Sequence, residues 1–268
     1  MALTVMTWNL KGSERPDTDV VVDRARAAGA DVLFLQEVQR RQARSIARGL
    51  GAVSLAWGFK HWPVIKPAEG MAVIGVSRRA DVRCHALTSG WMLWSSRRRI
   101  MQSGLIAAEA GPPGGAAGGD APGGPFRVVN LHLSPGRDSG LREREVARVL
   151  DILSTSGGGA TGDGSGGEVP LVLAGDLNDR SGAALFDHLD AAGLRDAWEV
   201  AHPGLPERDG ATNWSGGREG APQRRIDYVL VSLGVGVVAA SVPRPGDAGV
   251  EALRALSDHL PVTVVLQP

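Results

Sequence analysis

Polar side chains that can carry chemistry stand repeatedly beside apolar runs in this 268-residue sequence. The run 171–175, LVLAG, is followed directly by Asp176 and two residues later by Asn178. The same placement recurs along the chain at Asn9, Glu37, Asn130, His132, Asp227, Asp258 and His259. In layered α/β folds, ligands bind where strand ends open onto loops, so this distribution predicts one rim that carries a site.

The chemistry available to this set is cation binding and proton transfer. Carboxylate and amide oxygens are ligands for hard cations, and a histidine oriented by a carboxylate can hold or transfer a proton. Each residue alone also has an ordinary interpretation. Asp176 with Asn178 fits an Asx turn, Glu37 a charge at a helix start, and His132 a core histidine. Only the joint occurrence of the set favours a site.

Composition narrows the class of protein. The chain has 29 basic and 29 acidic residues, and this neutral balance argues against nonspecific nucleic-acid binding, which needs a basic surface. A local basic run remains at 97–99. The single cysteine, Cys84, excludes an intrachain disulfide framework and a thiolate metal cluster. With no signal-like start and no apolar run of membrane length, we expect a cytoplasmic monomer without membrane insertion.

Hydrophobic periodicity predicts alternating strands and helices. Runs rich in Val, Leu and Ile indicate strands at 3–8, 31–36, 71–77, 103–110, 126–133, 169–175, 225–232 and 260–266. Helical patterns occupy 19–30, 40–51, 139–153 and 181–194. Glycine-rich tracts near 110–125 and 155–169 fall between elements of one pattern, and we expect them to be flexible loops. The mixed order predicts one layered α/β domain spanning 1–268.

The ordered motifs TWN, LQE, NLH, GDLN, RIDYVL and SDH resemble those of the endonuclease/exonuclease/phosphatase superfamily. Members of this superfamily include deoxyribonucleases, abasic-site endonucleases, tyrosyl-DNA phosphodiesterases, sphingomyelinases and inositol-polyphosphate phosphatases. The resemblance extends from Asn9 to His259, nearly the whole chain. It implies a four-layer α/β/β/α sandwich of two packed mixed β-sheets flanked by helices, with one catalytic centre at an edge of the sandwich.

The resemblance also implies a divalent cofactor. Mg²⁺, or Mn²⁺ in its place, takes a few carboxylate oxygens and leaves coordination sites for substrate. Glu37 is the candidate for the principal ligand, supported by Asn9 and Asp258. The sequence has no Cys/His cluster with zinc spacing, which favours Mg²⁺ or Mn²⁺ over a closed zinc site.

By the same resemblance, Asp176 activates or orients the attacking water and Asn178 holds that water or a phosphate oxygen. His259 contacts the phosphoryl group, and Asp227 accepts the other ring proton of that histidine. His132 matches deoxyribonuclease-like, sphingomyelinase and deadenylase members, whereas abasic-site endonucleases usually carry tyrosine there. The resemblance therefore argues against a dedicated abasic-site enzyme.

Three further residues are candidates for substrate contact: Arg99, Asn130 and Trp214. Arg99 is the favoured member of the run 97–99, and Trp214 serves either substrate contact or loop packing. The expected function is metal-dependent hydrolysis of a phosphate ester by a phosphodiesterase or nuclease, with DNA or RNA as candidate partners. The alternative is a phosphatase for a small phosphorylated metabolite, sugar, inositol or lipid head group. A binding module without activity would require a broken catalytic set, and this set is intact.

Overall fold

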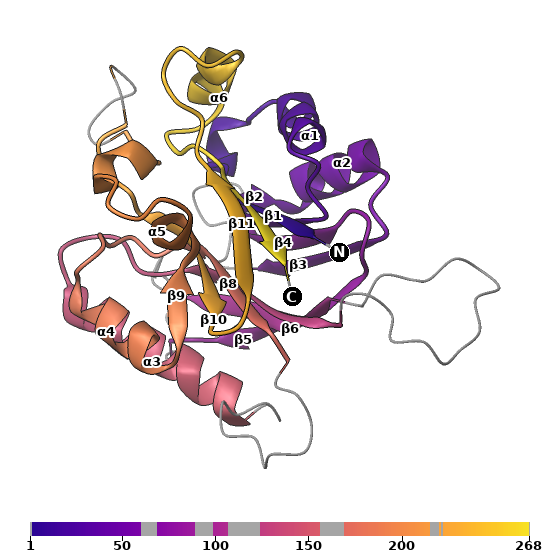
Figure 1. Cartoon of the computed structure of the whole chain (residues 1–268). Coiled ribbons are helices and arrows are strands. Elements are labelled where there is room, and N and C mark those ends of the chain that lie inside the picture. The colour runs from indigo at the N-terminus through magenta and orange to yellow at the C-terminus, as the bar shows by residue number, and fades with distance from the viewer. Residues whose placement is uncertain are drawn as a thin grey trace.

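Two mixed β-sheets pack face to face, and helices cover their outer faces in the computed structural model of the chain (Figure 1). The structure describes residues 2–59, 69–88, 99–106, 124–155, 169–214, 220 and 222–267. Most of the two glycine-rich tracts, together with Arg97 and Arg98, lies outside these residues. The four-layer α/β/β/α arrangement expected from the sequence is confirmed.

The first sheet, called sheet A, contains both terminal strands and has the order β11-β12-β1-β2-β4-β3. Its strands are β1 (Leu3–Asn9), β2 (Val32–Gln39), β3 (Ser54–Phe59), β4 (Glu69–Gly75), β11 (Gly236–Ser241) and β12 (Val262–Gln267). β1 and β2 are parallel, with Asn9 opposite Gln36, so their carboxyl ends lie at the same end of the sheet.

The second sheet, sheet B, has the order β5-β6-β7-β8-β10-β9. Its strands are β5 (Ala80–Ala86), β6 (Ile100–Ile106), β7 (Phe126–His132), β8 (Leu171–Asp176), β9 (Leu194–Asp196) and β10 (Asp227–Ser232). β7 and β8 are parallel and β10 is antiparallel to β8. The carboxyl ends of β7 and β8 therefore meet the amino end of β10.

Helices alternate with strands along the chain. The helical elements are η1 (Gly12–Glu14), α1 (Thr18–Ala27), α2 (Arg40–Leu50), α3 (Ser139–Thr155), α4 (Ala184–Ala191), α5 (Ala197–Ala201), η2 (Glu207–Gly210) and α6 (Val250–Leu256). α1 and α2 lie beside sheet A, and α3 and α4 lie on sheet B (Figure 1). None of the helices in the described ranges is long and apolar enough to cross a membrane.

The space between the sheets is apolar for most of its length and polar at one end. Val5 and Phe34 of sheet A and Val128 and Val229 of sheet B belong to one buried cluster. A second cluster, which includes Val146, lies between sheet B and the helices α3 and α4. The polar end is where β1, β2, β7 and β8 finish.

Candidate active site

Three side chains of the site lie in one row across sheet B. His132 at the end of β7 is in register with Asp176 at the end of β8, and Asp176 is in register with Asp227 at the start of β10. All three are buried. Strand register alone thus brings together residues that are widely separated in the sequence.

The backbone around Asp176 explains the motif GDLN. Gly175 has a φ of +145°, and a Cβ at this position would lie 2.0 Å from the carbonyl oxygen of Leu131 on β7. A glycine is therefore needed for β7 and β8 to approach each other beneath the site. Asn178 has a φ of +53°, which asparagine tolerates better than most residues.

Asn178 is fixed by two hydrogen bonds that leave one polar atom for a ligand. Its backbone N–H donates to Oδ1 of Asp176 at 2.9 Å, and its Nδ2 donates to the carbonyl of Leu133 at 3.0 Å. The first bond is the Asx turn that the sequence suggested. The side-chain Oδ1 of this half-buried residue has no hydrogen bond to a described residue, so it is available to water or substrate.

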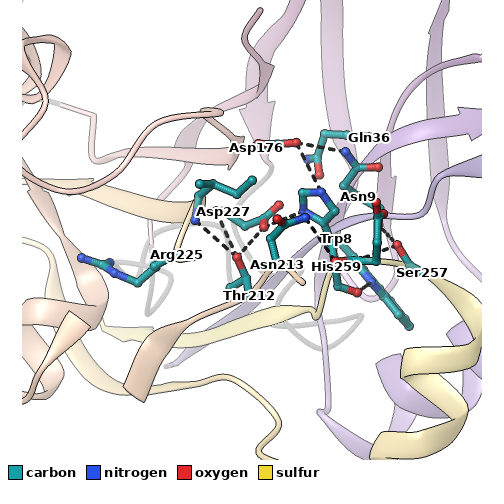
Figure 2. Close-up of polar contacts among 12 residues, drawn as sticks. Trp8, Asn9, Gln36, Asp176, Thr212, Asn213, Arg225, Asp227, Ser257 and His259 are labelled. Atoms are coloured by element: carbon teal, nitrogen blue, oxygen red, sulfur yellow. Dashed lines mark hydrogen bonds and ion pairs between the residues drawn. The ribbon is translucent and has the colours of Figure 1, made fainter. Parts of the chain in front are cut away.

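His259 is held from several sides, as Figure 2 shows. Its Nδ1 lies 2.8 Å from Oδ2 of Asp227, and its backbone carbonyl accepts a hydrogen bond from Nε1 of Trp8 at 2.9 Å. The hydroxyl of Thr212 donates to the same Asp227 oxygen at 2.6 Å. The backbone N–H of His259 donates to Oγ of Ser257 at 3.2 Å. The imidazole therefore has one fixed orientation, with Nε2 directed to the side of Asp176, 3.9 Å from Oδ2.

The charges of this group depend on one another. Burial opposes the imidazolium of His259, but the nearby Asp227 and Asp176 outweigh it and raise the pKa of His259 to about 10. Burial and the charge of Asp227 raise the pKa of Asp176 to about 7. His259 is therefore a cation at neutral pH, whereas ionised Asp176 needs further positive charge close to it.

Glu37 approaches the row from sheet A. Its Oε1 lies 3.7 Å from Nε2 of His132, and the same nitrogen lies 3.6 Å from Oδ2 of Asp176. Glu37 has a φ of +50° at an irregularity in the pairing of β2 with β4. A Cβ on Gly12 would lie 2.4 Å from the carbonyl oxygen of Glu37, so η1 packs closely against this strained residue. About a quarter of the Glu37 side chain is exposed.

Asn9 connects the end of β1 to the row. Its Nδ2 donates to Oδ2 of Asp176 at 3.0 Å, and its Oδ1 accepts the backbone N–H of Lys11 at 3.1 Å. The backbone carbonyl of Asn9 also accepts a hydrogen bond from Ser257 at 2.7 Å. The residue therefore positions both Asp176 and the segment that carries His259.

Two groups of residues can be tested for their fit to a cation. Ligand atoms of Asp176, Asp227 and His259 lie within 4.8 Å of one another, and Oδ1 of Asp227 is buried without a hydrogen bond to a described residue. The Nδ1 of His259 is already bonded to Asp227, so only its Nε2 could serve a metal in this group. Glu37 and Asp176 instead offer carboxylate oxygens, the donors that Mg²⁺ prefers. The Oδ1 of Asn9 already accepts the N–H of Lys11 and has a second lone pair for a cation.

Asn130 occupies a place different from the one expected. Its Oδ1 accepts a hydrogen bond from Gln36 at 2.8 Å, and its Nδ2 is within 3.3 Å of acceptors on Leu35, Ala72 and Gln102. The side chain is fully buried between the two sheets. We therefore correct the expectation of phosphate contact, because the side-chain amide of Asn130 forms its hydrogen bonds within and between the two sheets.

Asp258 and Trp214 contact each other beside His259, and the contacts of Trp214 favour the packing role over the substrate contact. Oδ2 of Asp258 lies 2.9 Å from Nζ of Lys11, so this carboxylate faces a cation and lies outside the Asp176, Asp227 and His259 group. Trp214 is buried, and its Nε1 donates to the carbonyl of Gly220 at 3.0 Å. Its backbone N–H donates to Asp258, which makes it a packing residue beneath the His259 segment rather than a substrate contact.

Arg99 lies under the site and is buried. Its Nε donates to Oγ of Ser134 at 3.2 Å, and its Nη1 has no hydrogen bond to a described residue. Burial lowers the pKa of Arg99, and the charges of Glu145, Glu37 and Asp176 oppose that effect. The guanidinium still remains protonated. A buried donor without a partner among the described residues is unusual, and it can bind water or substrate.

Sequence reasoning missed a buried polar cluster on α3. Nε of Arg142 lies 2.8 Å from Asp179, and its Nη1 donates to the carbonyls of Ser134 and Gly136 at 3.3 and 2.8 Å. Glu145 accepts two hydrogen bonds from Ser134, at 2.8 and 2.6 Å. These contacts tie the loop after β7 to the loop after β8. The signal was present in the sequence, because both charged residues continue the buried face of α3.

The sequence pattern of the Endonuclease/Exonuclease/phosphatase family matches residues 6–259. The chain therefore belongs to this family, whose members hydrolyse phosphate esters. A search of curated proteins found no match. The resemblance inferred from the ordered motifs is confirmed.

Solved structures with the same fold share little sequence with the chain. An endonuclease/exonuclease/phosphatase from Beutenbergia cavernae is 23% identical with a TM-score of 0.68, covering 99% of this chain and 71% of that one. The human Nocturnin catalytic domain with bound sulfate anion is 18% identical with a TM-score of 0.72, covering 99% and 93%. A mannosyl-6-phosphatase from Bacteroides thetaiotaomicron is 18% identical with a TM-score of 0.69, covering 98% and 99%.

Proposed function

We propose that the chain is a Mg²⁺- or Mn²⁺-dependent phosphodiesterase that uses an activated water. The observation that carries the proposal is the imidazole of His259, fixed by Asp227 beside the carboxylate of Asp176. A positive donor next to a carboxylate suits hydrolysis, because the donor stabilises charge on the phosphoryl oxygens while the carboxylate orients or deprotonates water.

The neighbouring residues have complementary roles in this proposal. Asn178 holds the water or a phosphate oxygen through its available Oδ1. Arg99 supplies the Nη1 that lacks a partner among the described residues. His132 lies between Glu37 and Asp176 and keeps the two carboxylates in place.

Glu37 is the proposed principal metal ligand, with Asp176 and Asn9 as further oxygen donors. The raised pKa of Asp176 supports this assignment, because burial and the charge of Asp227 disfavour the ionised carboxylate, which a nearby cation would stabilise. When bound, the metal ion supplies charge neutralisation for the phosphate and lowers the pKa of water. Mg²⁺ and Mn²⁺ are favoured because every proposed donor atom is oxygen.

A phosphodiester is the first substrate class to test. Glu37, Asp176 and Asp227 carry up to three negative charges, and His259, Arg99 and a divalent cation would together outweigh them. The charge at the site is therefore compatible with a phosphodiester and with a monoester. The phosphatase alternative is kept because the mannosyl-6-phosphatase shares the fold.

The proposed state of the protein is a cytoplasmic monomer. All of the proposed residues come from one chain, so no second copy is needed to complete the site. A single cysteine, Cys84, fits a reducing compartment.

Hydrolysis of bis-p-nitrophenyl phosphate and p-nitrophenyl phosphate, with Mg²⁺, with Mn²⁺ and with EDTA, tests the proposal. We expect turnover of the diester with metal and none with EDTA. Glu37→Gln should need a higher metal concentration for half-maximal rate. Hydrolysis of monoesters alone, including sugar phosphates, would establish the phosphatase alternative, and a metal requirement unchanged in Glu37→Gln would remove Glu37 from the metal site.

A further inference from the structure

Helix α2 carries four exposed arginines on one side, called here the arginine stripe: Arg40, Arg41, Arg44 and Arg48. At about 100° of rotation per residue, their positions fall within an arc of about 100°. The stripe is thus a single face of the helix rather than a scatter of charges.

The other faces of α2 are already used. Ala43 and Ile46 are buried against sheet A. Ser45 accepts a hydrogen bond from Thr18 of α1 at 3.2 Å, and a Cβ on Gly49 would lie 2.7 Å from Val22 of the same helix. The arginine stripe therefore occupies the remaining, exposed side of α2.

No arginine of the stripe has an ion pair or side-chain hydrogen bond with a residue in the described part of the chain. Like charges four residues apart on a helix repel each other, as at Arg40 with Arg44 and Arg44 with Arg48. Such a row is stabilised by an anion that contacts several of its members at once. A guanidinium forms paired hydrogen bonds with phosphate oxygens, which makes arginine suited to that contact.

A hollow of about 590 Å³ lies beside the stripe. It is lined by Arg44, Ala47, Arg48, Gly51, Ala52 and Leu55. Leu55 belongs to β3, an edge strand of sheet A, so the hollow lies between the second half of α2 and that edge. Cationic side chains at an otherwise apolar hollow match the parts of a nucleotide, which has a charged phosphate and a largely apolar base face.

The stripe begins close to the active site. Arg40 follows Glu37 by three residues, which places it within about 10 Å along the chain. Gln39 and Gln42 both donate to the carbonyl of Gly12, at 2.8 and 2.9 Å, and so fix the start of α2 to the segment after Asn9. From Arg40 to Arg48 the helix rises about 12 Å, away from the site.

We propose that the arginine stripe and its hollow bind the phosphate backbone of a nucleic-acid strand whose scissile phosphate lies in the active site. The inference rests on the proposed function and specifies that the substrate of the active site is a polymer. Four cations spread over about 12 Å of helix can contact consecutive phosphates of one strand. A neutral net charge does not oppose this, because the stripe is a local surface.

The test compares two variants with the parent chain. In the stripe variant, Arg40→Gln, Arg41→Gln, Arg44→Gln and Arg48→Gln are combined, since glutamine retains helix propensity. In the control variant, Arg83→Gln, Arg144→Gln, Arg148→Gln and Arg208→Gln remove the same number of exposed arginines from β5, α3 and η2. Circular dichroism establishes that both variants fold.

Binding is measured in EDTA by fluorescence polarisation with labelled 20-nucleotide DNA and RNA single strands at several salt concentrations. Loss of four phosphate contacts should lower the slope of log Kd against log salt by about 3, at about 0.7 per contact. We expect at least tenfold weaker binding for the stripe variant and less than twofold change for the control. Comparison of the DNA and RNA strands shows which of the two backbones binds more tightly.

Measurements of turnover distinguish a failure of the proposed function from a failure of this inference. The stripe variant should lose at least tenfold in kcat/KM on the oligonucleotide and retain its rate on bis-p-nitrophenyl phosphate. Absence of hydrolysis of every ester by the parent chain would refute the proposed function, while the binding assay would still decide the surface. Equal oligonucleotide binding by the stripe and control variants would overturn the inference, and so would stripe-dependent binding to vesicles containing phosphatidylserine without any effect on oligonucleotides.

Discussion

The imidazole of His259 lies between two carboxylates, and its charge state affects both phosphate contact and stability. Burial opposes the charged form, but Asp227 and Asp176 raise the pKa of His259 to about 10. A raised pKa means that the folded state holds the proton more tightly than the unfolded state does. The resulting stability is fully present below the unfolded pKa of about 6.5 and is lost as the pH rises through about 10.

This reasoning predicts the titration of His259. An NMR titration in EDTA should give a midpoint for the His259 ring well above that of an ordinary histidine, near pH 10. The free energy of unfolding should fall between pH 7 and 10, and the fall should be smaller in His259→Gln. A midpoint below pH 7 would show that the imidazole is neutral in the active site and would remove its proposed role as a cation.

The sequence identified the residue types of the site better than their roles. Strand register brings His132, Asp176 and Asp227 together. Asp176 and Asn178 are joined by a local turn, and Asp227 meets His259 through a contact between the two sheets. Asn130 was assigned to the phosphate, yet it lies two residues before the end of β7 and is consumed by hydrogen bonds to sheet A. The packing of the two sheets determines which polar residues near a strand end face the rim. The residues around a strand end do not reveal that packing.

At the level of elements, α3 fixes the two loops that carry the site. Arg142 pairs with Asp179, and their side chains are 5% and 17% exposed, so removal of the cation leaves a largely buried carboxylate without its partner. Arg142→Met should therefore destabilise the fold by about 3–5 kcal/mol. Because Asn178 precedes Asp179, kcat should fall as well.

Urea unfolding and steady-state kinetics check this prediction. Arg144→Met, an exposed change on the same helix, is the control and should shift the free energy of unfolding by less than about 0.5 kcal/mol. Combining Arg142→Met with Asp179→Asn should recover part of the stability by removing the unpaired charge. If Arg142→Met and Arg144→Met lowered the free energy of unfolding equally, the result would contradict a role for Arg142 in holding the loops.

The strands that sequence patterns missed are the four sheet edges: β3 and β11 in sheet A, and β5 and β9 in sheet B. Interior strands are covered on both faces and read as continuous apolar runs. An edge strand such as β5, ADVRCHA, carries exposed polar side chains and resembles a loop. The interior strands and the ordered motifs were enough to predict the fold class. The edge strands, and so the number of strands in each sheet, could not be predicted.

At the scale of the whole molecule, the site belongs to neither sheet alone. Asn9 of β1 bonds to Asp176 of β8, and Gln36 of β2 bonds to Asn130 of β7. One apolar cluster also contains residues of both sheets. Neither sheet can lose its structure without exposing the inner face of the other and breaking these buried hydrogen bonds.

We therefore predict one cooperative unfolding transition for the described fold, as expected for a single domain. Far-ultraviolet circular dichroism and tryptophan fluorescence should give the same midpoint in guanidinium chloride. Trp8 is buried on β1, so its fluorescence reports on the packing of sheet A. Two separated transitions would show that the sheets unfold independently and would count against one domain.

The measurement that tests the central claim most directly is the activity and stability of Asp176→Asn. Asparagine keeps the shape of the side chain and removes the charge that burial makes unfavourable. Metal-dependent hydrolysis of bis-p-nitrophenyl phosphate should fall about a thousandfold in kcat/KM. The free energy of unfolding at pH 8 should stay within about 1 kcal/mol of the parent. A variant that folds equally well and retains more than about a tenth of the activity would contradict the assignment of Asp176, and with it the active site described for this family member.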